Sequence, residues 1–237
     1  MVINTNIGAM RSARLLADST SKLNGALSRL ASGSKIVSPQ DDAAGLAVAT
    51  KFDAQISRNN AASNNVSSAL SYSQTQDGFL GKVSKALDRM SELMNLANDA
   101  TKSTNDKENY NTEFTDLKNY ISDLGTKEFN GVSLFDGSGL AVTKDSEGNT
   151  WTLNASDLND SDITSVIASG FTVTSTMSTL TTSIESVSTH RAQVGGNIQR
   201  LNLTNEQLGI LSENLSASVS RIKDVDVATE STQFARY

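Results

Sequence analysis

The chain has 237 residues and a formal net charge of −6 at pH 7, and 37% of its residues are hydrophobic but only 5% aromatic. Because aromatic side chains dominate core burial, this composition favours narrow seams between helices over a thick globular interior. The absence of cysteine and of any basic cluster excludes disulfide frameworks, thiolate metal sites and the usual nucleic-acid-binding surfaces.

The N-terminal residues contain no apolar core and no small-residue cleavage signature, so they do not form a conventional secretory signal. No stretch approaches the roughly 18 apolar residues of a membrane-spanning helix, so we predict no membrane segment. The protein either stays inside the cell or leaves by a route that reads no cleavable peptide. Residues 1–38 are basic, which could favour subunit packing or a pore surface, or could be scattered solvated charge.

The first predicted element is a helix whose seam positions recur at alternating intervals of three and four residues. These positions are Ala13, Leu16, Thr20, Leu23, Leu27 and Leu30. Gly33 is typical of a helix C-terminus, and the only proline, Pro39, fits the first position of the next helix with Ser38 as its N-cap. Asp41 lies where a capping-box acid would reach back. We therefore predict a break between roughly residues 32 and 41.

The same spacing runs through three further segments, which we predict to be helices. The second contains Ala62, Val66, Ala69, Ser73, Gln76, Leu80, Val83, Leu87, Met90, Met94 and Ala97, and the third Tyr110, Phe114, Leu117, Ile121 and Leu124. The fourth contains Leu180, Ile184, Val187, Arg191, Val194, Ile198, Leu201, Asn205, Leu208, Ser212, Leu215, Val219 and Ile222. A sustained seven-residue repeat predicts left-handed coiled-coil packing, and a helix of 40 residues would be about 60 Å long. The predicted fold is mainly α, a long coiled-coil-like helical rod.

Some seam positions are polar, and we interpret them as residues that fix helix register rather than as a buried functional site, the alternative. They are Ser73, Gln76, Arg191, Asn205 and Ser212. Between the third and fourth helices the pattern changes, because Asn130-Gly131 is a turn dipeptide and apolar residues then alternate weakly through residues 150–153. Residues 129–175 are therefore predicted to form β-hairpins with loops.

Catalytic signatures are absent from the sequence. The only histidine, His190, excludes two-histidine metal sites, and we predict it to be a solvated helix residue. Asp41 and Asp42 could bind a cation, but capping explains Asp41 better. Gly195-Gly196 lacks the flanking residues of a phosphate loop. We predict no enzyme activity, no metal and no cofactor.

Two stretches give the chain a resemblance to the bacterial flagellins. Residues 31–49, with Ser-Pro-Gln-Asp-Asp-Ala-Ala-Gly ending at Gly45, resemble their N-terminal signature. Residues 191–195 and 215–230, the latter ending in Asp224-Val-Asp226-Val-Ala-Thr-Glu, resemble their C-terminal block. Ile3 to Asn6 and the Phe129-Asn-Gly turn match as well.

The resemblance implies that the N- and C-terminal helices pair, with a small β-hairpin region between them. The implied segments are an inner helix (1–35), a spoke (36–56), outer-core helices (57–128), a short variable region (129–176), an outer-core helix (177–222) and a second inner segment (223–237). Flagellins usually continue further, so we expect the inner segment to be shortened and the usual C-terminal export-chaperone site to be missing.

The implied function is the repeating subunit of the flagellar filament, exported by the type III apparatus and located outside the cell. Its partners would be other subunits, the cap and junction proteins and an export chaperone, without nucleic acid or membrane. The residues assigned to filament packing are Leu16, Leu23, Leu27, Leu30, Asp41, Asp42, Gly45, Arg221, Asp224 and Asp226. Two alternatives are a hook–filament junction protein and, from another class, a surface adhesin carried on residues 136–176.

The resemblance also implies a surface for an animal innate-immune receptor on residues 87–96. Arg89, Glu92 and Leu93, with Glu113 on the next helix, match the recognised pattern, whereas Leu96 stands where a glutamine is usual. The alternative is an exposed helix face that packs on a neighbouring subunit.

Overall fold

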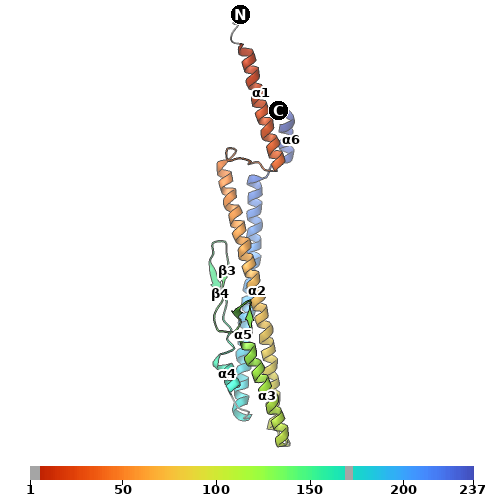
Figure 1. The fold of residues 1–237 in the computed structure, drawn as a ribbon, viewed down its shortest axis with the longest axis vertical. Helices are drawn as coiled ribbons and strands as arrows, with labels where there is room; N and C mark the ends of the chain where they lie inside the picture. The colour runs from red at the N-terminus through yellow and green to blue at the C-terminus, as the bar shows by residue number, and fades with distance from the viewer. Residues whose placement is uncertain (1–5, 169–172) are drawn as a thin grey trace. The chain divides into compact units, whose positions relative to one another are not determined.

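The computed structural model describes residues 6–168 and 173–237, and these are mainly helical (Figure 1). The helices are α1 (Ile7–Ser32), α2 (Ala43–Asn98), α3 (Thr104–Gly125), α4 (Ser161–Ala168), α5 (Val173–Lys223) and α6 (Val227–Arg236). The strands are β1 (Glu128–Phe129), β2 (Val132–Ser133), β3 (Ala141–Thr143) and β4 (Thr150–Thr152). The match expected at Ile3 lies outside the described residues. In the described part of the chain no helix is long and apolar enough to cross a membrane.

The chain divides into two compact units. The terminal unit comprises Met1–Asn60 and Ile210–Tyr237, and the central unit comprises Ala61–Gly209. Helices α2 and α5 each contribute residues to both units. Such long helices can form because the only proline of the chain, Pro39, precedes α2.

The core of the central unit follows the seven-residue repeat of α2. All eleven predicted seam positions from Ala62 to Ala97 are buried, with at most 5% of any of them exposed. On α5 the seam residues Leu180, Val187 and Leu201 are fully buried or nearly so. The α2 seam and these α5 positions are therefore confirmed, whereas the predicted seam position Arg191 is exposed.

Helices α2 and α5 run antiparallel in the central unit, and side-chain contacts mark their register. These contacts join Ser63 Oγ to Asn205 Oδ1 (2.7 Å), Asp77 Oδ1 to Arg191 Nε (2.9 Å) and Ser91 Oγ to Met177 Sδ (3.7 Å). Successive contacts lie 14 residues apart on both helices, which is two seven-residue repeats. The polar seam residues Arg191 and Asn205 thus pair with the facing helix, as a role in register requires.

Two antiparallel hairpins lie between α3 and α4. Asn130 and Gly131 have φ angles of 52° and 77°, so they form the tight turn that joins β1 to β2. In the second hairpin, Val142 of β3 faces Trp151 of β4. Gln76 of α2, a polar seam residue, donates through Nε2 to the Leu134 carbonyl at 2.6 Å and so ties this region to the seam.

One part of the predicted hairpin region is helical instead. Residues Ser161–Ala168 form α4, with Ile163 and Val166 fully buried or nearly so, one helical turn apart. The prediction of hairpins and loops throughout residues 129–175 is therefore wrong for this segment. A helix of two turns is too short for a 3.6-residue period to stand out in the sequence.

The predicted start of the second helix is also wrong. Ser38 and Pro39 belong to a turn, and α2 begins at Ala43 with the Asp42 side chain accepting from the Gly45 N–H at 2.8 Å. Asp41 does reach back as predicted, because its Oδ2 accepts from the Ser38 N–H at 2.8 Å. The end of the first helix is confirmed, since Gly33 adopts a φ of 68° as the cap of α1.

His190 is not the solvated residue that we predicted. Its side chain is half-buried, and neither ring nitrogen is accessible or has a hydrogen-bond partner among the described residues. The segment after β4 explains this burial. Asn154 pairs with Asn197, and the Asp162 carbonyl accepts from Ser183, so residues 154–162 follow the face of α5 on which His190 lies.

Candidate assembly surface

Helix α1 has one covered face and one uncovered apolar face. The covered face packs on α6, where Ser19 Oγ donates to the Tyr237 carbonyl at 3.0 Å and Ala26 is 3% exposed. Of the predicted seam residues, Leu16 is 69% and Leu27 is 49% exposed. Leu23 and Leu30, three and four residues from Ala26, border the covered face and are half-buried. Ile7, Met10 and Leu15 add exposed apolar surface. An amphipathic helix with an open apolar stripe requires a partner to bury it.

The two connectors that join the terminal helices to the long helices are hydrogen-bonded to each other. The Lys35 N–H donates to the Lys223 carbonyl at 2.6 Å, and the Val225 N–H donates to the Gly33 carbonyl at 3.1 Å. Ser34 Oγ adds a bond to the Lys223 carbonyl at 3.0 Å. We call residues 33–42 and 223–226 the joint. The backbone hydrogen bonds of the joint hold the two connectors together.

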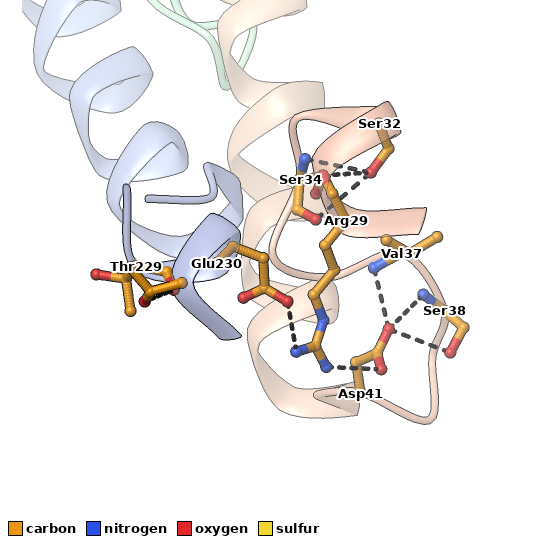
Figure 2. A network of polar contacts seen from close by, with 9 residues as sticks. Arg29, Ser32, Ser34, Val37, Ser38, Asp41, Thr229 and Glu230 are labelled. Atoms are coloured by element: carbon orange, nitrogen blue, oxygen red, sulfur yellow. Dashed lines mark hydrogen bonds and ion pairs between the residues drawn. The ribbon is translucent and has the colours of Figure 1, made fainter. Parts of the chain in front are cut away.

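Arg29 of α1 links the joint to α6, as Figure 2 shows. Its Nη2 lies 3.4 Å from Asp41 Oδ1, and its Nη1 lies 3.5 Å from Glu230 Oε1. Asp41 Oδ2 accepts hydrogen bonds from the backbone N–H groups of Ser38 and Val37, and these bonds hold the pKa of Asp41 below its ordinary value. Asp41 therefore stabilises the joint within one chain. The sequence alone does not distinguish this role from packing between copies.

Gly45 and Asp42, both assigned to filament packing, form one local structure at the start of α2. A Cβ at position 45 would lie 2.4 Å from Asp42 Oδ2 and 3.1 Å from Ile36 Cδ1. Only glycine leaves room for the Asp42 carboxylate to cap the first turn while Ile36 packs against it. The Asp-Asp-Ala-Ala-Gly motif thus has a structural cause within one chain.

The three C-terminal residues assigned to filament packing are Arg221, Asp224 and Asp226. Asp226 is the N-cap of α6 and accepts from Ala228 and Thr229, and the bonds from Thr229 hold its pKa low. Asp224 bridges to Ser34 within the joint. Arg221 is exposed near the end of α5. All three residues are exposed, but the carboxylates of Asp224 and Asp226 are hydrogen-bonded to Ser220 and Thr229 of the same chain.

The residues assigned to receptor recognition separate into a surface group and a core residue. Arg89 Nε donates to Glu113 Oε1 at 2.7 Å, and Arg89 Nη1 donates to Glu92 Oε2 at 2.9 Å. Glu113 raises the pKa of Arg89, and Arg89 in turn lowers the pKa of Glu113. Leu93, by contrast, is 0% exposed in the core of the central unit, so it cannot present a surface in this structure.

Two residues of the terminal unit were missed by the sequence assignment. Glu230 is only 7% exposed although it is charged, and its partner Arg29 lies near the other end of the chain. No local pattern signals this pairing, because Glu230 looks like an ordinary acid in the first turn of α6. No group of three or more histidine, cysteine or acidic side chains able to hold a metal ion occurs among the described residues.

Two family models match the helical parts of this chain. Residues 3–140 match the bacterial flagellin N-terminal helical region, and residues 177–237 match the bacterial flagellin C-terminal helical region. The residues between these two matches include β3, β4 and α4.

The relatives cover the whole chain. It is 33% identical to a flagellin of Halalkalibacterium halodurans, over 100% of this chain and 90% of that protein. It is 28% identical to the flagellar filament 30.7 kDa core protein of Treponema maltophilum, over 100% of this chain and 90% of that protein. The crystal structure of Bacillus cereus flagellin superposes with a TM-score of 0.55 at 28% identity, covering 61% of this chain and 88% of that one. The chain is a structural subunit of a flagellar filament and belongs to the bacterial flagellin family.

Proposed function

We propose that the chain polymerises by burying the open apolar stripe of α1 against other copies of itself. The observation that carries this proposal is the exposure of Leu16 and Leu27, at 69% and 49%, on a helix whose other face is already covered. Full burial of a leucine side chain contributes about 1.5–3 kcal/mol. A head-to-tail contact that does not close on itself produces a helical filament. The chain is a structural protein, not an enzyme.

The joint gives the polymerising helices a defined geometry. The backbone bonds between Lys35 and Lys223 and between Gly33 and Val225 hold α1 and α6 at the ends of paired connectors. The stripe is thereby presented in one orientation, which reduces the entropy lost when copies associate. Arg29 and Asp41 support the same arrangement through their ion pair.

Replacing the stripe tests the proposal. The Leu16→Ser and Leu27→Ser double variant should keep the circular dichroism of the wild type but fail to form filaments in negative-stain microscopy. Val132→Ser is the matched control, since Val132 is 45% exposed but lies on β2, and it should polymerise normally. Filaments of wild-type yield and length from the double variant would refute the role of the stripe.

The export route and the partners other than further copies of the chain are proposed from the same family membership. The subunit belongs to the extracellular flagellar filament. It leaves through the flagellar type III apparatus and adds beneath a cap after junction proteins. Support for this route comes from the membership of the chain in the flagellin family. Secretion that stops in a type III export mutant would agree with it, and continued secretion would contradict it. An export chaperone would hold the terminal helices before export by a site other than the usual C-terminal one, and a pull-down of the unexported precursor tests this.

Recognition by an animal innate-immune receptor would use the exposed group Arg89, Glu92 and Glu113. These three side chains form a paired charge cluster at 44%, 65% and 45% exposure. Arg89→Ala should reduce receptor signalling while leaving the seam intact, and an unchanged response would remove the cluster from the proposal. The alternatives of a hook–filament junction protein and of an adhesin on residues 136–176 are not favoured by any of these findings.

A further inference from the structure

In the terminal unit two carboxylates share the single positive charge of one neighbouring guanidinium. Arg29 is shared between Asp41 at 3.4 Å and Glu230 at 3.5 Å, as the sticks of Figure 2 show. Glu230 is 7% exposed, and its Oε1 receives no hydrogen bond among the described residues. A buried carboxylate oxygen with only a long ion pair still has capacity for a donor.

A cavity of 310 Å³ opens beside these carboxylates. Its lining includes Arg29, Asp41, Glu230, Gln233 and Lys22. Lys22 does not make up the missing charge, because its Nζ is paired with Asp18 Oδ2 at 2.8 Å. The cavity therefore has the size and the charge to accept a further cationic side chain.

Helix α1 carries two exposed arginines near its N-terminal end. Arg11 and Arg14 are exposed, and among residues 6–168 and 173–237 neither forms an ion pair. Together with Ile7 and Met10 they line a hollow of 390 Å³ on α1. The spacing of these four residues places them on one face of the helix. The face is basic and apolar, and so complements the acidic cavity.

These arginines cannot reach the cavity of their own chain. Arg11, Arg14 and Arg29 belong to one uninterrupted helix, so a rise of 1.5 Å per residue separates the first two from Arg29 by roughly 22–27 Å. An arginine side chain is several times shorter than this distance. If Arg11 or Arg14 fills the cavity, its guanidinium must come from another molecule.

We infer that, in the filament, the basic face formed by Ile7, Met10, Arg11 and Arg14 of one copy docks on the cavity at Arg29, Asp41 and Glu230 of a second copy. The inference rests on the polymerisation proposed above and names the charged contact that sets its register. The guanidinium of Arg11 or Arg14 pairs with Glu230 and Asp41, and Ile7 and Met10 are buried beside it. The two copies are then offset along α1 by roughly 22–27 Å.

Cross-linking between copies tests the docking directly, because the chain contains no cysteine. Copies carrying Arg14→Cys are mixed with copies carrying Gln233→Cys, polymerised, and treated with a short bifunctional maleimide. We expect a heterodimer in filaments and none in the unpolymerised mixture. Asn202→Cys, at an exposed position of α5 in the central unit, replaces Arg14→Cys in the control mixture and should give no heterodimer with Gln233→Cys.

A charge cycle tests the ion pair in case the cysteine variants fail to polymerise. The Arg11→Gln and Arg14→Gln double variant should lower the depolymerisation temperature of filaments, and Glu230→Gln should remove most of that effect. Equal effects of the double variant in both backgrounds, or filaments without the heterodimer, would overturn the inference. Failure of the wild-type chain to polymerise at all would instead contradict the proposed function.

Discussion

The carboxylate of Asp42 accepts a hydrogen bond from the Gly45 N–H at 2.8 Å and occupies the space that a Cβ at position 45 would need. The two residues therefore depend on each other. Glycine is a poor helix former by about 1 kcal/mol relative to alanine, so its presence in the first turn of α2 has a cost. The cap at Asp42, with Ile36 packed against the same turn, offsets that cost.

We predict that Gly45→Ala changes sign with its background. In the wild type, the new methyl group displaces the Asp42 carboxylate, and the lost cap, about 0.5–2 kcal/mol, cancels or exceeds the gain in helix propensity. In an Asp42→Ala background no cap remains to be lost, so Gly45→Ala should stabilise by up to about 1 kcal/mol. Urea unfolding of the four chains measures the cycle. Equal effects in both backgrounds would show that the two residues are independent.

The buried polar residues of the α2 seam should respond to substitution in opposite ways. Ser73 is fully buried, and its Oγ has no hydrogen-bond partner among the described residues, so Ser73→Ala should stabilise the chain by about 1 kcal/mol. Gln76 satisfies the Leu134 carbonyl, and Gln76→Met would leave that oxygen without its donor, at a cost of about 1–3 kcal/mol. Both changes keep the seam position filled. Denaturant midpoints of the two variants give the comparison, and destabilisation by Ser73→Ala would contradict the assignment.

The predictable part of the fold is the part that depends on local repetition. A seven-residue period records the same burial many times, so the seam from Ala62 to Ala97 could be read from the sequence. The start of α2 could not be placed, because Ser38 and Asp42 are both good N-caps four residues apart. Asp41 decides between them, since its carboxylate closes the turn onto Val37 and Ser38 and leaves Asp42 to begin the helix.

The candidate site was predictable only where the evidence lies in one segment. Leu16 and Leu27 recur in a heptad stripe, and the structure leaves both exposed, so their burial between copies stays a prediction. Glu230 could not, because its burial depends on Arg29, a residue distant in the sequence. Leu93 was placed on a surface by family pattern alone, whereas the structure buries it in the core of the central unit, next to the seam position Met94.

The joint should loosen in acid through Asp41. The folded state holds the pKa of Asp41 below its ordinary value of 3.8, chiefly through the Ser38 and Val37 N–H groups. A lowered pKa contributes stability above the pKa of the unfolded chain, and that contribution is lost as the pH falls through the folded pKa. We expect exchange of the Ser38 amide proton to lose protection below about pH 4. Asp41→Asn should show little of this transition, and an unchanged transition would assign it to another acid.

The only tryptophan of the chain reports on how the second hairpin is held to α5. Trp151 is 8% exposed, Arg200 Cζ lies 3.9 Å from the centre of its ring, and Asn197 exchanges two hydrogen bonds with the Asn154 backbone at 3.2 and 3.1 Å. Asn197→Ala removes both bonds and leaves a partly buried peptide group unpaired, at about 1–3 kcal/mol.

The hairpin of the Asn197→Ala variant should therefore detach before the helices unfold. Tryptophan emission should shift to the red at lower denaturant concentration than the loss of helical circular dichroism, whereas the two transitions coincide in the wild type. Asn202→Ala, at an exposed position of the same helix, should leave them coincident. Coincident transitions in Asn197→Ala would mean that Trp151, Leu153 and the seam unfold as one cooperative unit, with the asparagine pair adding only to its overall stability.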